Sequence, residues 1–293
     1  DQAVALLREQ LAQLAPDSWL RAEAQRRIES ALRQQGGADA LNDFYVAWLD
    51  EHPDDIAMRL AHAQELSRRG RIAEAEAALI AIIEQAASRR DAHAMLARLY
   101  IEQARYRDAA DVYQALCERD PLDAGAWERL GRIHISDLSR PQADRRHDAA
   151  AAWRHVASEQ PNDPTRAVRA AELFRQAAMP DVAIEHYQQA IALDPASPEY
   201  HEYLARYLHE LGRKDQAAAA ARQMIQIDRV PADHRVRLIE VLLSFGYFDA
   251  ALEDIDRAAD DTHRYELLSM RVAAFMNLDR FADAALTLDE LQS

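Results

Sequence analysis

Apolar residues recur along the chain at helical spacing, and the same arrangement returns about every 34 residues. An alanine opens each copy, and mostly large apolar residues follow at the fourth and the seventh position after it. This spacing places all three residues on one face of an α-helix. The alanines are Ala40, Ala75, Ala109, Ala149, Ala183, Ala217, Ala251 and Ala284. Their spacings are 35, 34, 40, 34, 34, 34 and 33 residues. The pattern predicts one helix, helix B, in every copy.

A second column precedes these alanines and predicts another helix, helix A. Its members are Ala63, Ala97, Gly131, Ala171, Ala205, Ile239 and Val272. Between the two columns lie Gly70, Gly212 and Gly246, and glycine accepts the left-handed conformation that ends a helix. After helix B come Asp120-Pro121 and Asp194-Pro195, where the proline cannot continue the helix. Each period therefore predicts a helical hairpin, and no segment sustains the two-residue alternation of a strand.

The hairpins resemble the tetratricopeptide repeat family, and the resemblance covers nearly the whole chain. The best single match consists of Trp127, Leu130, Gly131 and His134, followed by Ala149, Trp153, Val156 and Pro161. At His134 the chain departs from the family, which usually has tyrosine there. The resemblance implies an all-α, right-handed solenoid, or superhelix, of about eight hairpins. It also implies that helices A line a concave groove in which protein partners bind.

We expect one solenoid domain over residues 1–293, with an orphan helix at 1–15, because no linker rich in Pro, Gly or Ser divides the chain. The predicted repeats cover approximately 21–55, 56–89, 90–123, 124–163, 164–197, 198–231, 232–264 and 265–293. No polar capping helix follows Leu291, so we interpret the chain as a segment of a longer array. Exposed apolar ends would also allow end-to-end self-association.

One repeat is 40 residues long, and its six extra residues fall around Ser139 to His147. This stretch contains Arg140, Arg145 and Arg146. It is either an exposed basic contact loop, or a neutral insertion or a longer end to helix A.

Charge and composition narrow the class of partner. With 35 basic and 50 acidic residues the net charge is −15, which opposes general attraction to nucleic acid or to an anionic membrane. No apolar run approaches the ~20 residues that cross a bilayer, so we expect no direct membrane insertion. Arginine supplies 34 of the 35 basic residues, as in proteins of GC-rich genomes, and we expect a bacterial source. The compartment is left open.

The sequence shows no catalytic, cofactor-binding or metal-binding motif, and we predict that the chain is not an enzyme. The single cysteine, Cys117, rules out an internal disulfide and is interpreted as a buried small hydrophobe. His201 and His209 lie eight residues apart on one helix, too far for chelation from one helical turn.

The candidate partner-binding residues lie on the side of helix A opposite its packing column. They are Gln64, Arg68, Arg98, Glu102, Glu128, Arg132, Glu172, Arg175, Glu202, Arg206, Glu210 and Glu240, with Asp233 beside them. Their mixed charge indicates either a polarised groove for an extended peptide or a partner helix of complementary charge, or solvated helix faces on which any charge is tolerated. A clamp of Lys and Asn for a C-terminal carboxylate is excluded, because the chain has only one lysine, Lys214.

Two functions are compatible with these observations. The first is a non-catalytic interaction scaffold that binds a protein or peptide in the groove. The alternative is the recognition arm of a larger enzyme, such as a glycosyltransferase or a kinase, whose catalytic domain lies outside this segment.

Overall fold

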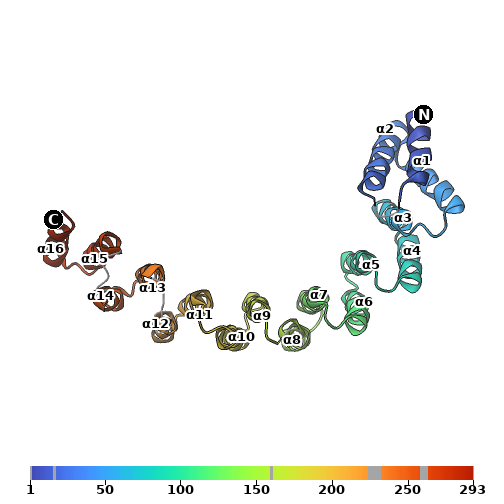
Figure 1. The fold of residues 1–293 in the computed structure, drawn as a ribbon. Helices are drawn as coiled ribbons and strands as arrows, with labels where there is room; N and C mark the ends of the chain where they lie inside the picture. Colours follow the sequence, from blue (N-terminus) through green and yellow to red (C-terminus); the bar gives the residue numbers. More distant parts are fainter. Residues whose placement is uncertain (1, 16–17, 159–160, 224–231, 258–262, 293) are drawn as a thin grey trace. The chain divides into compact units, whose positions relative to one another are not determined.

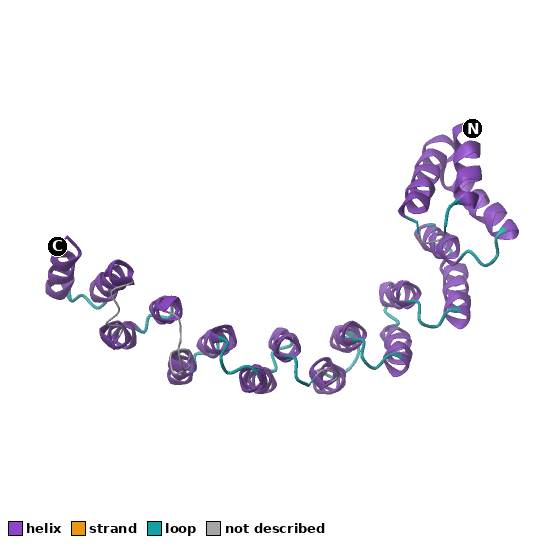
Figure 2. Cartoon of the chain, viewed as in Figure 1, coloured by secondary structure: helices purple, strands orange, loops and turns teal. Residues whose placement is uncertain are grey.

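The computed structural model describes residues 2–15, 18–158, 161–223, 232–257 and 263–292, without the side chains of 2–5, 35–38 and 232–234. Every regular element in these residues is a helix, which confirms the all-α prediction (Figures 1 and 2). The helices are α1 (Gln2–Gln13), α2 (Trp19–Glu51), α3 (Ile56–Arg68), α4 (Ile72–Gln85), α5 (Arg90–Glu102), α6 (Tyr106–Arg119), α7 (Ala124–Ser136), α8 (Gln142–Ser158), α9 (Pro164–Gln176), α10 (Pro180–Leu193), α11 (Pro198–Glu210), α12 (Lys214–Gln223), α13 (Ala232–Ser244), α14 (Phe248–Arg257), α15 (Arg264–Asn277) and α16 (Phe281–Gln292).

From residue 56 onward the predicted repeats coincide with pairs of helices. Each begins within one residue of an odd-numbered helix, which is helix A, and the next even-numbered helix is helix B. Helix A packs on its own helix B in the pairs α3/α4, α5/α6, α9/α10, α11/α12, α13/α14 and α15/α16. The predicted orphan helix is α1.

The chain divides into two compact units, Asp1–Ala149 and Ala150–Ser293, which are described separately. In the first unit α3 contacts α5, and in the second α11 contacts α13 and α13 contacts α15. These are all helices A, so within each unit neighbouring helices A form a common surface, which we call the helix A face. A single domain over residues 1–293 stays a prediction.

The alanine column lies at the centre of the hairpins. Seven of the eight alanines are at most 2% exposed, namely Ala75, Ala109, Ala149, Ala183, Ala217, Ala251 and Ala284. One turn later Tyr187, Trp153 and Tyr113 are also buried. A small side chain lets two helices approach closely, and the large one beyond it fills the space between them.

The first predicted repeat, 21–55, differs from the others in form, because the structure assigns a single helix, α2, from Trp19 to Glu51 in place of two separate helices. Ala40 accordingly lies inside α2 and is partly exposed. The two halves of α2 nevertheless lie side by side, since the Tyr45 hydroxyl donates to Glu29 Oε1 at 2.7 Å. A straight helix would separate these residues by about 24 Å. The helix therefore doubles back between them, and Gly pairs such as Gly36-Gly37 are typical sites of sharp kinks.

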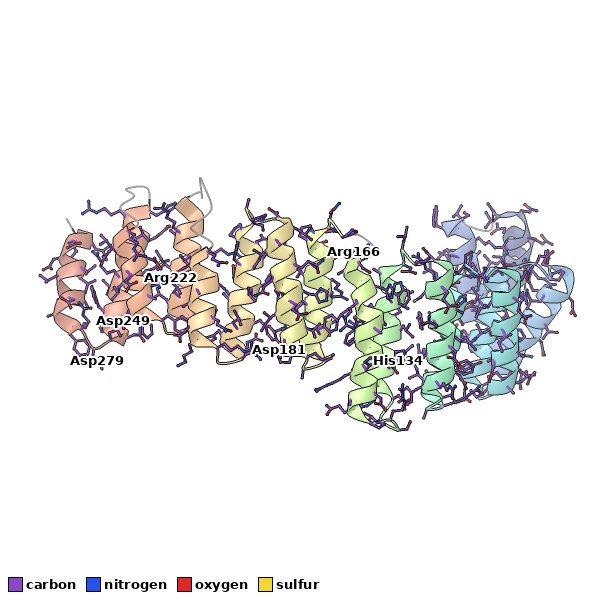
Figure 3. The ribbon with its side chains drawn as sticks, turned by 90° about the horizontal axis from the view of Figure 1, so that it is seen from below. His134, Arg166, Asp181, Arg222, Asp249 and Asp279 are labelled. Carbon is purple, nitrogen blue, oxygen red and sulfur yellow. The ribbon has the colours of Figure 1, made fainter. Side chains whose placement is uncertain are left out.

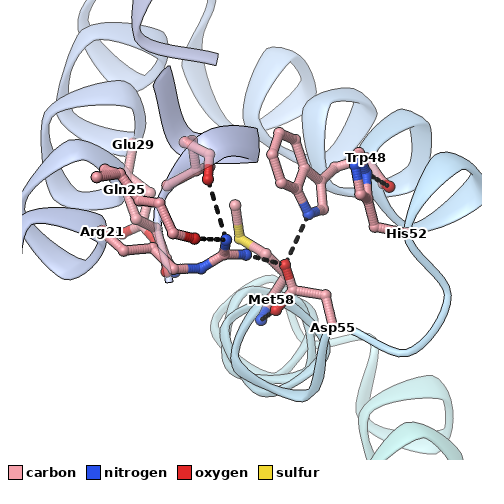
Figure 4. A network of polar contacts seen from close by, with 9 residues as sticks. Arg21, Gln25, Glu29, Trp48, His52, Asp55 and Met58 are labelled. Carbon is pink, nitrogen blue, oxygen red and sulfur yellow. Dashed lines mark hydrogen bonds and ion pairs between the residues drawn. The ribbon is translucent and has the colours of Figure 1, made fainter. Parts of the chain in front are cut away.

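A buried polar network holds this N-terminal arrangement together (Figure 4). Arg21 forms an ion pair with Asp55, and Trp48 Nε1 donates to Asp55 Oδ2 at 2.9 Å. Arg21 Nη1 also donates to the carbonyl oxygen of Leu11 at 3.0 Å. Asp55 is the N-cap of α3, where its Oδ1 accepts from the Met58 amide. The network thus joins α1, both halves of α2 and the start of α3.

The six extra residues of the long repeat lie in the turn after α7 and in the first turns of α8. Helix α7 has the usual 13 residues, whereas α8 has 17 against 14 in α4, α6 and α10. Arg140 pairs with Asp148 at 2.7 Å, and Arg145 donates to the carbonyl oxygen of Ile135. The insertion therefore lengthens the start of helix B, not the end of helix A. Two of its arginines bind groups within the same chain.

Candidate functional site

In the first unit, four of the predicted partner-binding residues line one hollow. It lies between α3 and α5, has a volume of about 270 Å³, and is lined by Gln64, Arg68, Arg98 and Glu102 together with Ala63, Ser67, Leu79, Met95 and Leu99. All four predicted residues are exposed, while the buried Leu99 supplies part of an apolar floor. The spacing of 34 residues brings Gln64 and Arg98 to equivalent positions on neighbouring helices.

The charges of this hollow are already paired within the chain. Arg98 Nε lies 2.8 Å from Glu102 Oε1. Arg68 Nη1 lies 3.6 Å from Glu65 Oε2, and Glu65 is only 5% exposed. Sequence reasoning missed Glu65 because it lies between packing positions, where the pattern gives no sign of a buried carboxylate.

On α7 the predicted residues Glu128 and Arg132 form their own ion pair, with Oε1 and Nη2 2.8 Å apart. Neither lines the hollow between α3 and α5. The structure therefore places them on a helix A but does not gather them with the other four.

In the second unit, a hollow of about 470 Å³ lies between α11 and α13 and contains Glu202, Arg206 and Glu240. Glu202 is only 6% exposed and accepts from Arg206 Nε at 2.8 Å and from Arg237 Nε at 2.6 Å. It is thus an internal anchor rather than a free contact residue. Arg237, which also lines the hollow, was missed because it lies two residues before the column position Ile239.

The remaining three predicted residues link α9 to α11. Arg175 Nη1 lies 2.8 Å from Glu210 Oε2, and Arg175 Nε lies 3.1 Å from Glu172 Oε2. The Tyr187 hydroxyl of α10 also donates to Glu172. These residues stabilise the stacking of two repeats. The side chain of Asp233 lies outside the described residues.

The cysteine and the two histidines that the sequence analysis considered for chemistry have structural surroundings. Cys117 is buried, and its burial raises the pKa of the thiol to about 12, so the reactive thiolate is suppressed. His201 is buried, whereas the His209 ring stacks on Phe245 with centroids 4.2 Å apart. Among the side chains that the structure describes, no group of three or more His, Cys, Asp or Glu could hold a metal ion. The described helices also include none with the length and apolarity needed to cross a membrane.

Comparisons with known proteins agree with the repeat pattern. Two tetratricopeptide repeat models match residues 90–133 and 168–234. A tetratricopeptide repeat-containing protein of Treponema pallidum is 29% identical over 199 residues, which are 63% of this chain and 22% of that protein. The match therefore spans less than a quarter of that relative's length.

The comparison with solved structures matches two tetratricopeptide repeat proteins. The one from Parabacteroides merdae has 14% identity and a TM-score of 0.40, covering 94% of this chain and 100% of its own. The one from Thermus thermophilus has 21% identity and a TM-score of 0.34, covering 64% and 99%. Helical hairpins at a 34-residue period and the two matching repeat models lead to one assignment: the chain contains tetratricopeptide repeats, which the models match at residues 90–133 and 168–234.

Proposed function

We propose that this chain is a non-catalytic scaffold whose helix A face binds a protein partner, with the hollow between α3 and α5 as the main contact. The observation that supports this proposal is the convergence of Gln64, Arg68, Arg98 and Glu102 on that hollow. Tetratricopeptide repeats are protein-interaction modules, which agrees with it. A recognition arm of a larger enzyme would use the same face.

The partner segment that fits is extended and carries an acidic residue next to an apolar one. The side chains of Arg98 and Arg68 are 79% and 54% exposed, so each guanidinium group is accessible to a partner carboxylate. The exposed Arg98–Glu102 pair contributes at most about 1 kcal/mol, so exchanging Glu102 for a partner carboxylate costs little. An apolar side chain on the floor near Leu99 would then exclude water from the new pair.

The test places a photo-crosslinking amino acid at Gln64 in the native host and identifies the captured protein. Arg68→Glu with Arg98→Glu should abolish that capture, because both charges facing the partner are reversed. The control is Arg119→Glu, because Arg119 is also exposed but lies on α6, which is a helix B. Arg222 is unsuitable as a control, since its guanidinium joins α12 to Glu253 and the buried Asp254 of α14 (Figure 3).

Circular dichroism of both variants establishes that equal amounts of folded protein are compared. Capture of the same partner by the double variant and by the control would move the binding surface away from the hollow between α3 and α5. The scaffold class would then stand without this site.

A further inference from the structure

A second pocket of about 360 Å³ lies between α4, α5 and α6 and shares no residue with the hollow between α3 and α5. Its walls are apolar and come from the two helices B and the helix A between them. The apolar residues are Ile80, Ile83, Leu96, Val112 and Ala115. Ile80 is 37% exposed, so the apolar wall reaches the surface.

The hydrogen-bond donors around this pocket are already used. Arg105 Nη1 and Nη2 donate to the two carboxylate oxygens of Glu76, at 2.8 and 3.2 Å, and Arg105 Nε donates to Asp108 at 2.6 Å. The Tyr100 hydroxyl also donates to Glu76, at 3.0 Å. The guanidinium group and the phenol therefore have little to offer to a ligand.

The acceptors, in contrast, are open. His93 lines the pocket and is only 3% exposed, and its Nδ1 lies 2.9 Å from the carbonyl oxygen of Arg89. A carbonyl oxygen only accepts, so Nδ1 carries the hydrogen, and Nε2 has no hydrogen-bond partner among the described residues. Glu84 and Asp111 stand at the rim, both exposed, and neither forms an ion pair with another of the described residues.

Apolar walls and unused acceptors together select a ligand with an apolar stem and a cationic head. Arginine and lysine have this form, because their methylene chains lie along apolar surface while the charged group stays at the rim. We infer that this pocket receives a basic side chain from a partner protein, with its stem against Ile80 and Ile83 and its head between Glu84 and Asp111. Arginine fits better than lysine, since its planar fork meets carboxylates with two hydrogen bonds and is weakly hydrated.

This pocket differs in sign from the hollow between α3 and α5, where two arginines face the solvent. The net charge of −15 favours approach of a basic segment to the chain as a whole. The inference therefore stands independently of the proposed function, and a partner could use one site without the other.

The test follows the δ1-methyl signals of isoleucine by NMR in the full 293-residue chain. The probe is a capped pentapeptide, Ala-Leu-Arg-Leu-Ala, and the control probe replaces arginine with citrulline, which has the same shape without the charge. The arginine peptide should shift the Ile80 and Ile83 signals to saturation, and the citrulline peptide should shift them much less.

The matched variants separate the rim carboxylates from general charge. Glu84→Gln with Asp111→Asn should weaken the arginine peptide about fivefold, as expected for two exposed ion pairs. Glu118→Gln, which removes an exposed carboxylate outside the pocket, should leave the affinity unchanged. Arg68→Glu should also leave it unchanged, which distinguishes this pocket from the helix A face.

The remaining isoleucine signals show that each variant is folded. Equal shifts with the citrulline peptide, equal affinity in the double variant, or no saturable shift of Ile80 and Ile83 would each overturn the inference.

Discussion

At the scale of single residues, the turn between helices A and B repeats a backbone conformation more strictly than a residue type. Positive φ angles occur at Gly70 (73°), Gly212 (72°) and Gly246 (76°), and also at Ala104 (58°), Ala178 (53°) and Asp279 (57°). The three glycines are the turn residues that the sequence predicts. The other three positions lie 33 or 34 residues from one of these glycines, but residue type alone does not mark them, and an L residue in this conformation costs about 1–2 kcal/mol.

Ala104→Gly should therefore stabilise the protein by about 1 kcal/mol, because glycine removes the strain of the left-handed conformation. Gly70→Ala should destabilise it by a similar amount, since a Cβ there would meet no atom within 4 Å and only the backbone cost remains. Urea denaturation of both variants measures the two changes. A loss of stability in Ala104→Gly would contradict the argument.

Four buried or partly buried histidines lead us to predict that the protein loses stability in mild acid. Burial lowers the pKa of His62, His134, His186 and His201. Below about pH 6.5 these histidines bind protons in the unfolded chain, whereas in the folded protein they stay neutral until a lower pH. The free energy of unfolding therefore falls as the pH falls. Carboxylates with a lowered pKa, such as Glu76, reduce the free energy of unfolding only at lower pH, as the pH falls past their ordinary pKa of 4.5.

The variant His134→Tyr places the residue usual in the family at this half-buried position and removes one of the four titrations (Figure 3). Urea denaturation at about pH 7.5 and about pH 5.5 should show a smaller difference in the variant than in the native protein. An unchanged difference would exclude His134 from the acid response.

At the scale of elements, the apolar spacing was sufficient for the helix pairs but not for their polar contacts. Helix bounds from α3 onward follow from the two columns, because burial of a stripe at helical spacing is a local property. The reversal inside α2 depends on contacts between residues 16 positions apart, such as Glu29 with Tyr45, and these leave no periodic trace. The double pairing of Glu202 likewise requires Arg237 from the next repeat.

Within the α9/α10 hairpin, Ala183 and Tyr187 are 0% and 1% exposed, as the alanine column requires. Tyr187→Ala should cost about 3–5 kcal/mol, and Ala183→Leu should cost about 1–3 kcal/mol through overpacking. Tyr187→Phe isolates the hydrogen bond to Glu172 and should cost only about 1 kcal/mol. Denaturant melts in which the first two variants are neutral would mean that the column is misplaced.

At the scale of the whole molecule, repeats pack on their neighbours within each unit, and α16 keeps an apolar surface. Leu288, which the sequence places in a packing column, is 44% exposed, and Leu286 is 64% exposed. We predict concentration-dependent self-association through this helix, because exposed leucines gain from burial against another chain. Light scattering after size exclusion should show the mass rising with concentration, and Leu286→Glu with Leu288→Glu should abolish the rise. A native mass that stays monomeric throughout would refute it.

The internal pairing of the arginines in the helix A face has a consequence for how binding responds to ionic strength. A surface of unpaired arginines holds small anions, which an acidic ligand releases, and its affinity then falls steeply with added salt. Here Arg98 already has Glu102 as its counterion. A partner carboxylate therefore displaces the Glu102 side chain and releases few dissolved anions. Since screening also weakens the pair that is lost, the affinity of an acidic partner should change little with salt. Measured across a salt series, the dissociation constant should vary little for the native chain and steeply once Glu102→Gln leaves Arg98 without its partner.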